Sequence, residues 1–89
     1  MRLIKLHYGD DKKMAYINPL HVTTLIENYV DRYNFAKNKT EEVNEGTEIT
    51  FCDYDTTIRV RESIDVVASK INDEFNKLAI NNVETLTIN

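Results

Sequence analysis

Apolar and polar residues alternate along short stretches of the first two thirds of this chain, with a period of two residues. That period is typical of β-strands that are buried on one face only. The alternating stretches cover residues 3–8, 14–17, 22–26, 47–52 and 57–61. Turn-forming residues at 9–13 and 53–55 predict two hairpins, and Asn18-Pro19 predicts a corner, because proline cannot donate a hydrogen bond to a sheet.

The hydrophobic period changes just after Arg61, where a predicted strand leads directly into a predicted helix. Ser63 is placed to cap the helix N-terminus, and Asp65 lies in the first turn, where the helix dipole favours a negative charge. Apolar residues then recur at spacings of three and four; they are Ile64, Val67, Ala68, Ile71, Phe75, Leu78 and Ala79. We expect a helix over 64–79 whose apolar stripe covers one face of the sheet.

The last segment, residues 80–89, returns to alternation over 83–88. This pattern predicts an extended tail that pairs with a sheet edge, either of its own chain or of a neighbouring copy. Together the segments predict a single α+β domain over residues 1–89, in which a small antiparallel sheet of four to five strands packs one face against a C-terminal amphipathic helix. The length of 89 residues agrees, because two separate cores would each be too small to fold readily.

Between the strands, residues 28–46 form a polar excursion without a clear period. Tyr29, Tyr33 and Phe35 stand out in it, because aromatic residues in a solvated segment usually pack against something. The excursion could extend the hairpin, fold back onto the sheet, or face a partner protein. The pattern leaves local packing and an interface as equal alternatives.

The chain carries a net charge of −4, which argues against nucleic-acid binding as its main function. A weaker form of that function stays open, because Arg59 and Arg61 fall on one face of a predicted strand and Tyr54 could stack on a base. The simpler interpretation is a solvated sheet face. Acidic residues of the excursion favour it, since they would repel a phosphate backbone.

No combination of side chains predicts an enzyme, a metal site or a cofactor. Cys52 is expected to be a small buried hydrophobic residue, and His7 and His21 lack the close spacing of a zinc site with it. Asp53 fits a hairpin turn, and Glu62 fits the start of the helix. The lone cysteine and the lack of a long apolar run predict a cytoplasmic protein without a membrane-spanning segment.

A series of short motifs runs through the predicted strands into the helix. The motifs are Tyr16-Ile17-Asn18-Pro19, then His21-Val22 and Ile26, then Ile58-Arg59-Val60-Arg61-Glu62-Ser63-Ile64 followed by Val67 and Ile71. In this order they resemble the small FlbD-type family of flagellar accessory proteins and similar small phage and bacterial proteins, over residues 2–27 and 46–78. The resemblance implies a strand-rich fold with one C-terminal helix, no enzymatic activity and an association with motility. The excursion and the tail depart from the family pattern and add surface where an interaction could be made.

These predictions favour a non-catalytic protein–protein interaction or assembly module of bacterial or phage origin. One helix cannot cover a whole sheet, so we expect self-association into a small homo-oligomer, and an unknown protein partner besides. The candidate partner-binding residues are Tyr29, Tyr33, Phe35, Leu86 and Ile88. The alternative is a weak nucleic-acid-binding accessory protein that uses Arg59 and Arg61.

Overall fold

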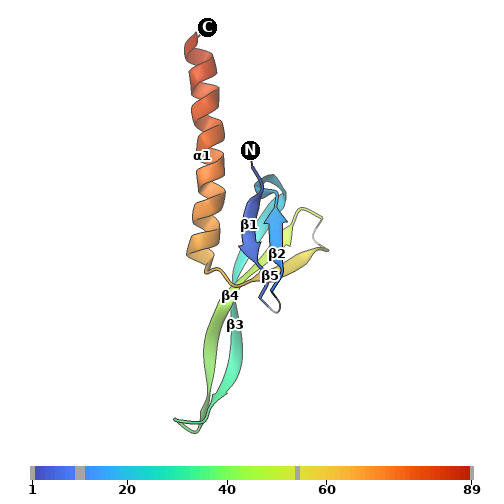
Figure 1. Ribbon diagram of the computed structural model, residues 1–89, viewed down its shortest axis with the longest axis vertical. Coiled ribbons are helices and arrows are strands. Elements are labelled where there is room, and N and C mark those ends of the chain that lie inside the picture. The colour runs from blue at the N-terminus through green and yellow to red at the C-terminus, as the bar shows by residue number, and fades with distance from the viewer. Residues whose placement is uncertain (1, 10–11, 54, 89) are drawn as a thin grey trace.

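The computed structural model describes residues 2–9, 12–53 and 55–88, with side chains up to residue 78. Its elements in chain order are β1 (Ile4–His7), β2 (Met14–Ile17), the 3-10 helix η1 (Pro19–His21), β3 (Val22–Asn34), β4 (Lys39–Phe51), β5 (Thr57–Val60) and α1 (Ile64–Ile88) (Figure 1). The predicted α+β class is confirmed.

The five strands form two antiparallel sheets instead of one. β1 pairs with β2, while β3, β4 and β5 pair in that order. Both predicted hairpins are therefore confirmed, but each sheet has fewer strands than the four to five expected of a single sheet. The division follows from η1, where the buried Pro19 separates β2 from β3. A bridge between Tyr8 and Val60 joins the two sheets at one corner.

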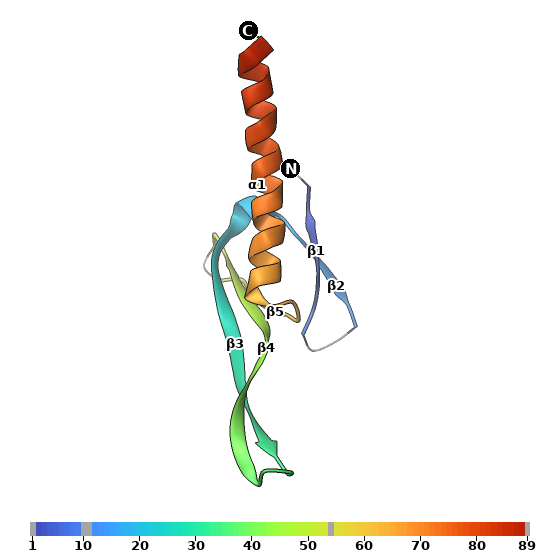
Figure 2. The same ribbon diagram turned by 90° about the vertical axis from the view of Figure 1, so that its left-hand side faces the viewer.

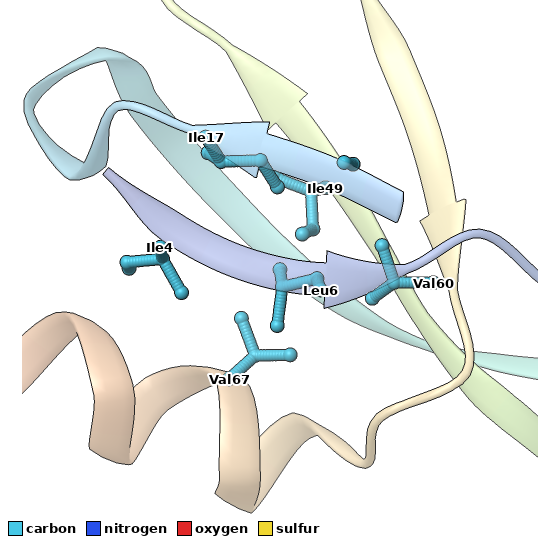
Figure 3. Packing of buried hydrophobic residues seen from close by; sticks show 7 residues of the cluster. Ile4, Leu6, Ile17, Ile49, Val60 and Val67 are labelled. Carbon is cyan, nitrogen blue, oxygen red and sulfur yellow. The ribbon is translucent and has the colours of Figure 1, made fainter. Parts of the chain in front are cut away.

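The core of the described part of the chain consists of buried apolar side chains from both sheets and the start of the helix (Figure 3). They are Ile4, Leu6, Ala15, Ile17, Ile49, Val60 and Val67. Ile4 and Leu6 are buried, whereas Lys5 and His7 between and after them are exposed, as the alternation along β1 predicts. The helix contributes the fully buried Val67, so the core holds three elements together: the two sheets and α1.

Beyond this core, β3 and β4 continue as a two-stranded projection, the hairpin arm, which we define as residues 28–45 (Figure 1). Each of the two strands has 13 residues. Of the three alternatives for residues 28–46, extension of the hairpin is confirmed. A clear period is missing from this segment because neither face of the arm is buried, so no face has to be apolar.

α1 extends away from the core in the direction opposite to the hairpin arm (Figures 1 and 2). The prediction of an extended tail over 80–89 is wrong for residues 80–88, which continue the helix, and residue 89 lies outside the described residues. Each residue added to an existing helix forms a backbone hydrogen bond, whereas an extended tail needs a sheet edge as its partner.

The apolar stripe of α1 covers the core only along its first turns. Val67 is buried and Ile71 packs against the core, but Phe75 and Leu78 are 40% and 39% exposed. The expectation that the whole stripe covers the sheet is therefore wrong. Although α1 has 25 residues, the described part of the chain contains no helix that is both long and apolar enough to cross a membrane.

The two projections make the molecule long and thin, with extents of 66 × 25 × 22 Å (Figure 2). Its radius of gyration is 17.1 Å, whereas a compact chain of this length would have a radius of gyration of about 12 Å. A large share of the side chains therefore lies outside the only packed region that the described residues form.

Gly46 marks the point at which the hairpin arm leaves the three-stranded sheet. Between the Glu27–Thr47 and Tyr29–Asn44 pairs, one residue of β3 lies opposite two residues of β4, Glu45 and Gly46, which is a β-bulge. Gly46 has a φ of 120°, and a Cβ atom there would lie 1.9 Å from the carbonyl oxygen of Val60. The bulge thus requires glycine, both for its backbone angle and for the close approach of β5.

We expect Gly46→Ala to lower the free energy of unfolding by at least about 3 kcal/mol, because backbone strain adds to a clash with main-chain atoms. Gly9→Ala is the matched control: its Cβ would lie 3.6 Å from the nearest atom, Arg59 O, which is an ordinary contact. The control should change stability by only about 0.5 kcal/mol. Urea denaturation measures both, and equal effects would contradict the role given to Gly46.

Candidate interaction surface

One face of the hairpin arm alternates acidic and aromatic side chains. Residues directly opposite each other in an antiparallel pair share a face, and Asp31 lies opposite Glu42 on the same face as Tyr29 and Tyr33. Glu27 precedes Tyr29 by two residues and belongs to this face as well. We call this set the aromatic–acidic face; its members are Glu27, Tyr29, Asp31, Tyr33 and Glu42.

The aromatic residues predicted to bind a partner are exposed along this arm. Tyr29 is 53% exposed, Tyr33 48% and Phe35, in the turn at the tip, 87%. The rings of Tyr33 and Phe35 contact each other edge to face, with centroids 4.8 Å apart, and the Tyr33 hydroxyl donates a hydrogen bond to the Asn38 side-chain oxygen. Local packing therefore orders the tip, but it leaves both rings on the surface and away from the core.

Negative charge gathers on the aromatic–acidic face. A hydrogen bond with Glu27 and the negative charge of Glu27 raise the pKa of Tyr29, and the charge of Glu42 adds to this rise. A hydrogen bond with the side chain of Asn44 acts in the opposite direction but is weaker. The phenol of Tyr29 is therefore held in its neutral form beside two carboxylates.

The basic residues of the arm form ion pairs that leave this face acidic. Arg32 Nη2 lies 2.6 Å from Glu45 Oε1, and Lys37 Nζ and Lys39 Nζ lie 3.2 Å and 3.8 Å from Glu41 Oε1. Arg32 lies between Asp31 and Tyr33 in β3, so its side chain lies on the opposite face of the arm, which we call the back face. The two faces of the arm thus differ in both charge and aromatic content.

A hollow at the base of the arm brings Arg59 and Arg61 together, as their spacing along the predicted strand 57–61 indicates. Its volume is about 390 Å³, and it is lined by Gly9, Asn28, Arg32, Asn44, Glu45, Arg59 and Arg61. We call it the arginine hollow. The Arg59 Nε atom lies 3.4 Å from Glu48 Oε2, and this side chain stays 59% exposed. Tyr54, the predicted stacking residue, lies outside the described residues.

The structure adds residues that the sequence interpretation missed. Arg32 joins the two predicted arginines only because β3 and β4 bring the base of the arm beside β5. Glu27, Asp31 and Glu42 were treated as general acidity of the excursion. The sequence pattern could have placed Glu27 and Asp31 on this face. Together with Tyr29 and Tyr33 they recur at spacings of two residues, which is the period of one face of a strand.

Glu62, expected at the start of the helix, fastens β1 to the junction between β5 and α1. Its carboxylate accepts hydrogen bonds from the main-chain N–H of His7 at 2.9 and 3.1 Å, and its Oε2 lies 2.9 Å from His7 Nδ1. Burial alone would raise the pKa of Glu62, but the hydrogen bonds from the His7 ring and main chain outweigh it and lower that pKa below its ordinary value. This pair has a structural role.

The other polar candidates also fill structural positions. Asp53 holds the β4–β5 turn, because its carboxylate accepts hydrogen bonds from the Thr56 hydroxyl (2.6 Å) and the Thr56 main-chain N–H (2.9 Å), which lower its pKa. Cys52 is exposed, so the prediction of a buried thiol is wrong; the turn that follows β4 carries it out of the sheet. Within the described residues, no three His, Cys, Asp or Glu side chains are placed to hold a metal ion.

Leu86 and Ile88, predicted to lie on an extended tail, belong to the last turns of α1, and their side chains are outside the described set. Comparisons with protein-family models, curated proteins and solved structures find no match for this chain. The FlbD-type resemblance therefore stays a prediction. The surfaces of the hairpin arm are the features from which a function has to be inferred.

Glu62→Gln should make the stability of the protein less dependent on acid pH. Because the folded pKa of Glu62 lies below the unfolded value, its ionised form stabilises the fold above about pH 4.3, and this contribution is lost as the pH falls through the folded pKa. At neutral pH the substitution should cost about 1–2 kcal/mol. Between about pH 6 and pH 3, the free energy of unfolding should fall less in the variant than in the wild type.

Glu48→Gln is the control for this measurement, since it also removes a glutamate from an ion pair, but the Arg59 partner is exposed. It should lower stability by about 0.5 kcal/mol or less. A pH dependence that is identical in the wild type and Glu62→Gln would show that His7 and Glu62 do not fasten β1 to the helix.

Proposed function

We propose that this protein is a non-catalytic assembly module of bacterial or phage origin that acts in the cytoplasm by associating with further copies of itself. The observation that carries the proposal is the hairpin arm, which projects from the core (Figure 1). Its side chains Tyr29, Tyr33 and Phe35 are exposed. Tyrosine and phenylalanine are enriched at interfaces because they bury a large apolar area with few rotatable bonds.

The balance between core and surface supports self-association. The core has few side chains, and α1 beyond its first turns leaves Phe75 and Leu78 partly exposed. Two long projections without packing partners would cost conformational entropy in a lone molecule, and burial against another copy offsets that cost. Neighbouring copies would present the same surfaces, which makes symmetric assembly the simplest way to bury them.

The non-catalytic part of the proposal rests on the hydrogen bonds of the acidic candidates. Asp53 is engaged with Thr56 in a turn, and Glu62 is engaged with His7 beside the helix start. A general acid or base works best with a pKa near the working pH, whereas the hydrogen bonds of Asp53 and Glu62 lower the pKa of both carboxyl groups. The flagellar association implied by the FlbD-type resemblance is compatible with an assembly module, and the proposal does not depend on it.

The molar mass of the eluting protein, measured by light scattering, tests the proposal. We expect a mass of at least twice the 10.4 kDa of one chain, increasing with concentration. Tyr33→Ser combined with Phe35→Ser should yield a monomer with nearly unchanged thermal unfolding, because both side chains are exposed and lie away from the core. Tyr16→Ser, which removes a 63% exposed tyrosine from β2, should leave the mass unchanged.

A wild-type protein that stays monomeric at every concentration would overturn the proposal. A large loss of stability in the Tyr33 and Phe35 variant would contradict the placement of these rings outside the core. An oligomer that survives this double substitution would move the interface from the arm to another surface, such as α1.

A further inference from the structure

We propose that neighbouring copies join head to tail, with the aromatic–acidic face of one hairpin arm seated on the arginine hollow of the next copy. The inference rests on the proposed function and names the two surfaces that assembly would use. The aromatic–acidic face runs along the arm and the hollow lies at its base, and the pairing of β3 with β4 holds the arm extended away from that base, so one copy cannot satisfy its own contact.

Charge complementarity is the first reason to match these surfaces. The aromatic–acidic face presents the carboxylates of Glu27, Asp31 and Glu42, whereas the hollow is lined by three arginines and one glutamate. The guanidinium-bearing side chains of Arg32 and Arg59 are 64% and 59% exposed, so their ion pairs with Glu45 and Glu48 leave them accessible. Opposite potentials on two surfaces speed their encounter and fix their orientation.

The aromatic rings supply the second reason. Phe35 and Tyr33 stand at the tip as an exposed pair, and a hollow of about 390 Å³ has room for an aromatic side chain. Arginine side chains bind the faces of such rings through cation–π contacts and stack on them well. A partner surface rich in arginine therefore suits the aromatic residues as well as the carboxylates.

The head-to-tail arrangement differs from a two-fold dimer, in which two copies would exchange arms reciprocally and leave no surface free. In a head-to-tail contact every open complex keeps one free arm face and one free hollow at its ends, so assembly continues until it closes as a ring or grows as a filament. Pairing of two α1 helices would instead use the same surface twice and stop at a dimer. The size of the oligomer thus depends on which surface is used.

Charge reversal on each surface, followed by mixing, tests the inference. Arg59→Glu with Arg61→Glu reverses the hollow and leaves the arm intact, and Asp31→Lys with Glu42→Lys reverses the aromatic–acidic face. Light scattering should find each double variant monomeric alone, because each would bring like charges together. In an equal mixture the opposite surfaces match again, and oligomers should re-form. Arg59→Gln with Arg61→Gln provides a milder version should the reversed hollow fail to fold, as judged by circular dichroism.

The control matched to the arm-face variant is Asp55→Lys with Asp73→Lys, which makes the same change of charge as Asp31→Lys with Glu42→Lys at two exposed positions outside the arm. It should keep the wild-type mass. If the wild type is oligomeric but either charge-reversed variant keeps its mass, or if the mixture stays monomeric, the head-to-tail contact is wrong while the proposed function stands. A monomeric wild type would overturn both. Binding of a labelled oligonucleotide is measured on the same samples. If the wild type binds it, and Arg59→Glu with Arg61→Glu abolishes that binding but leaves the molar mass of the protein unchanged, the hollow is a nucleic-acid site and the head-to-tail contact is wrong.

Discussion

The packing of Leu6, Val60 and Val67 is the interaction on which the rest of this structure depends (Figure 3). These side chains come from β1, β5 and α1, which belong to the two sheets and the helix, and each is almost fully buried. Burying a side chain of this kind contributes about 1.5–3 kcal/mol, so a core with few members leaves little margin. The bonds between His7 and Glu62 reinforce the same junction, because they tie β1 to the chain just ahead of the helix.

A core of this size cannot support the whole chain, and the shape of the molecule follows from that limit. The far part of the hairpin arm extends where the described residues offer nothing to pack against, and Phe75 and Leu78 on α1 stay partly exposed. An isolated hairpin or a short helix has marginal stability in water. Such projections are most stable when another molecule covers them, which is the physical basis for proposing assembly over any function performed by a lone chain.

The hairpin arm separates its charges although its sequence mixes them. Acidic and basic residues follow one another closely along β3, yet adjacent residues of a strand point to opposite faces. Glu41 and Glu45 form ion pairs with the basic residues on the back face of the arm, and the carboxylates of the aromatic–acidic face lie beside exposed rings. At the base of the arm, the approach of β5 collects arginines from two strands into one hollow. The bulge at Gly46 sets where the arm leaves the sheet and therefore how these two surfaces are placed.

The sequence by itself determined the local elements: the β1–β2 and β4–β5 hairpins, the strand that leads into the helix at Ser63, and the α+β class. These depend on hydrophobic period and turn chemistry, which act between residues close in the chain. Tertiary structure decided the division into two sheets, the exposed position of Cys52 and the path of residues 28–46 and 80–88. Along residues 28–45 no face is buried in the core, so hydrophobic period carries little information there, and in both segments backbone pairing with a neighbouring strand or within a helix selects the conformation. The proximity of Arg32 to Arg59 and Arg61 could not be predicted from the sequence either, because it depends on strand register across the whole three-stranded sheet.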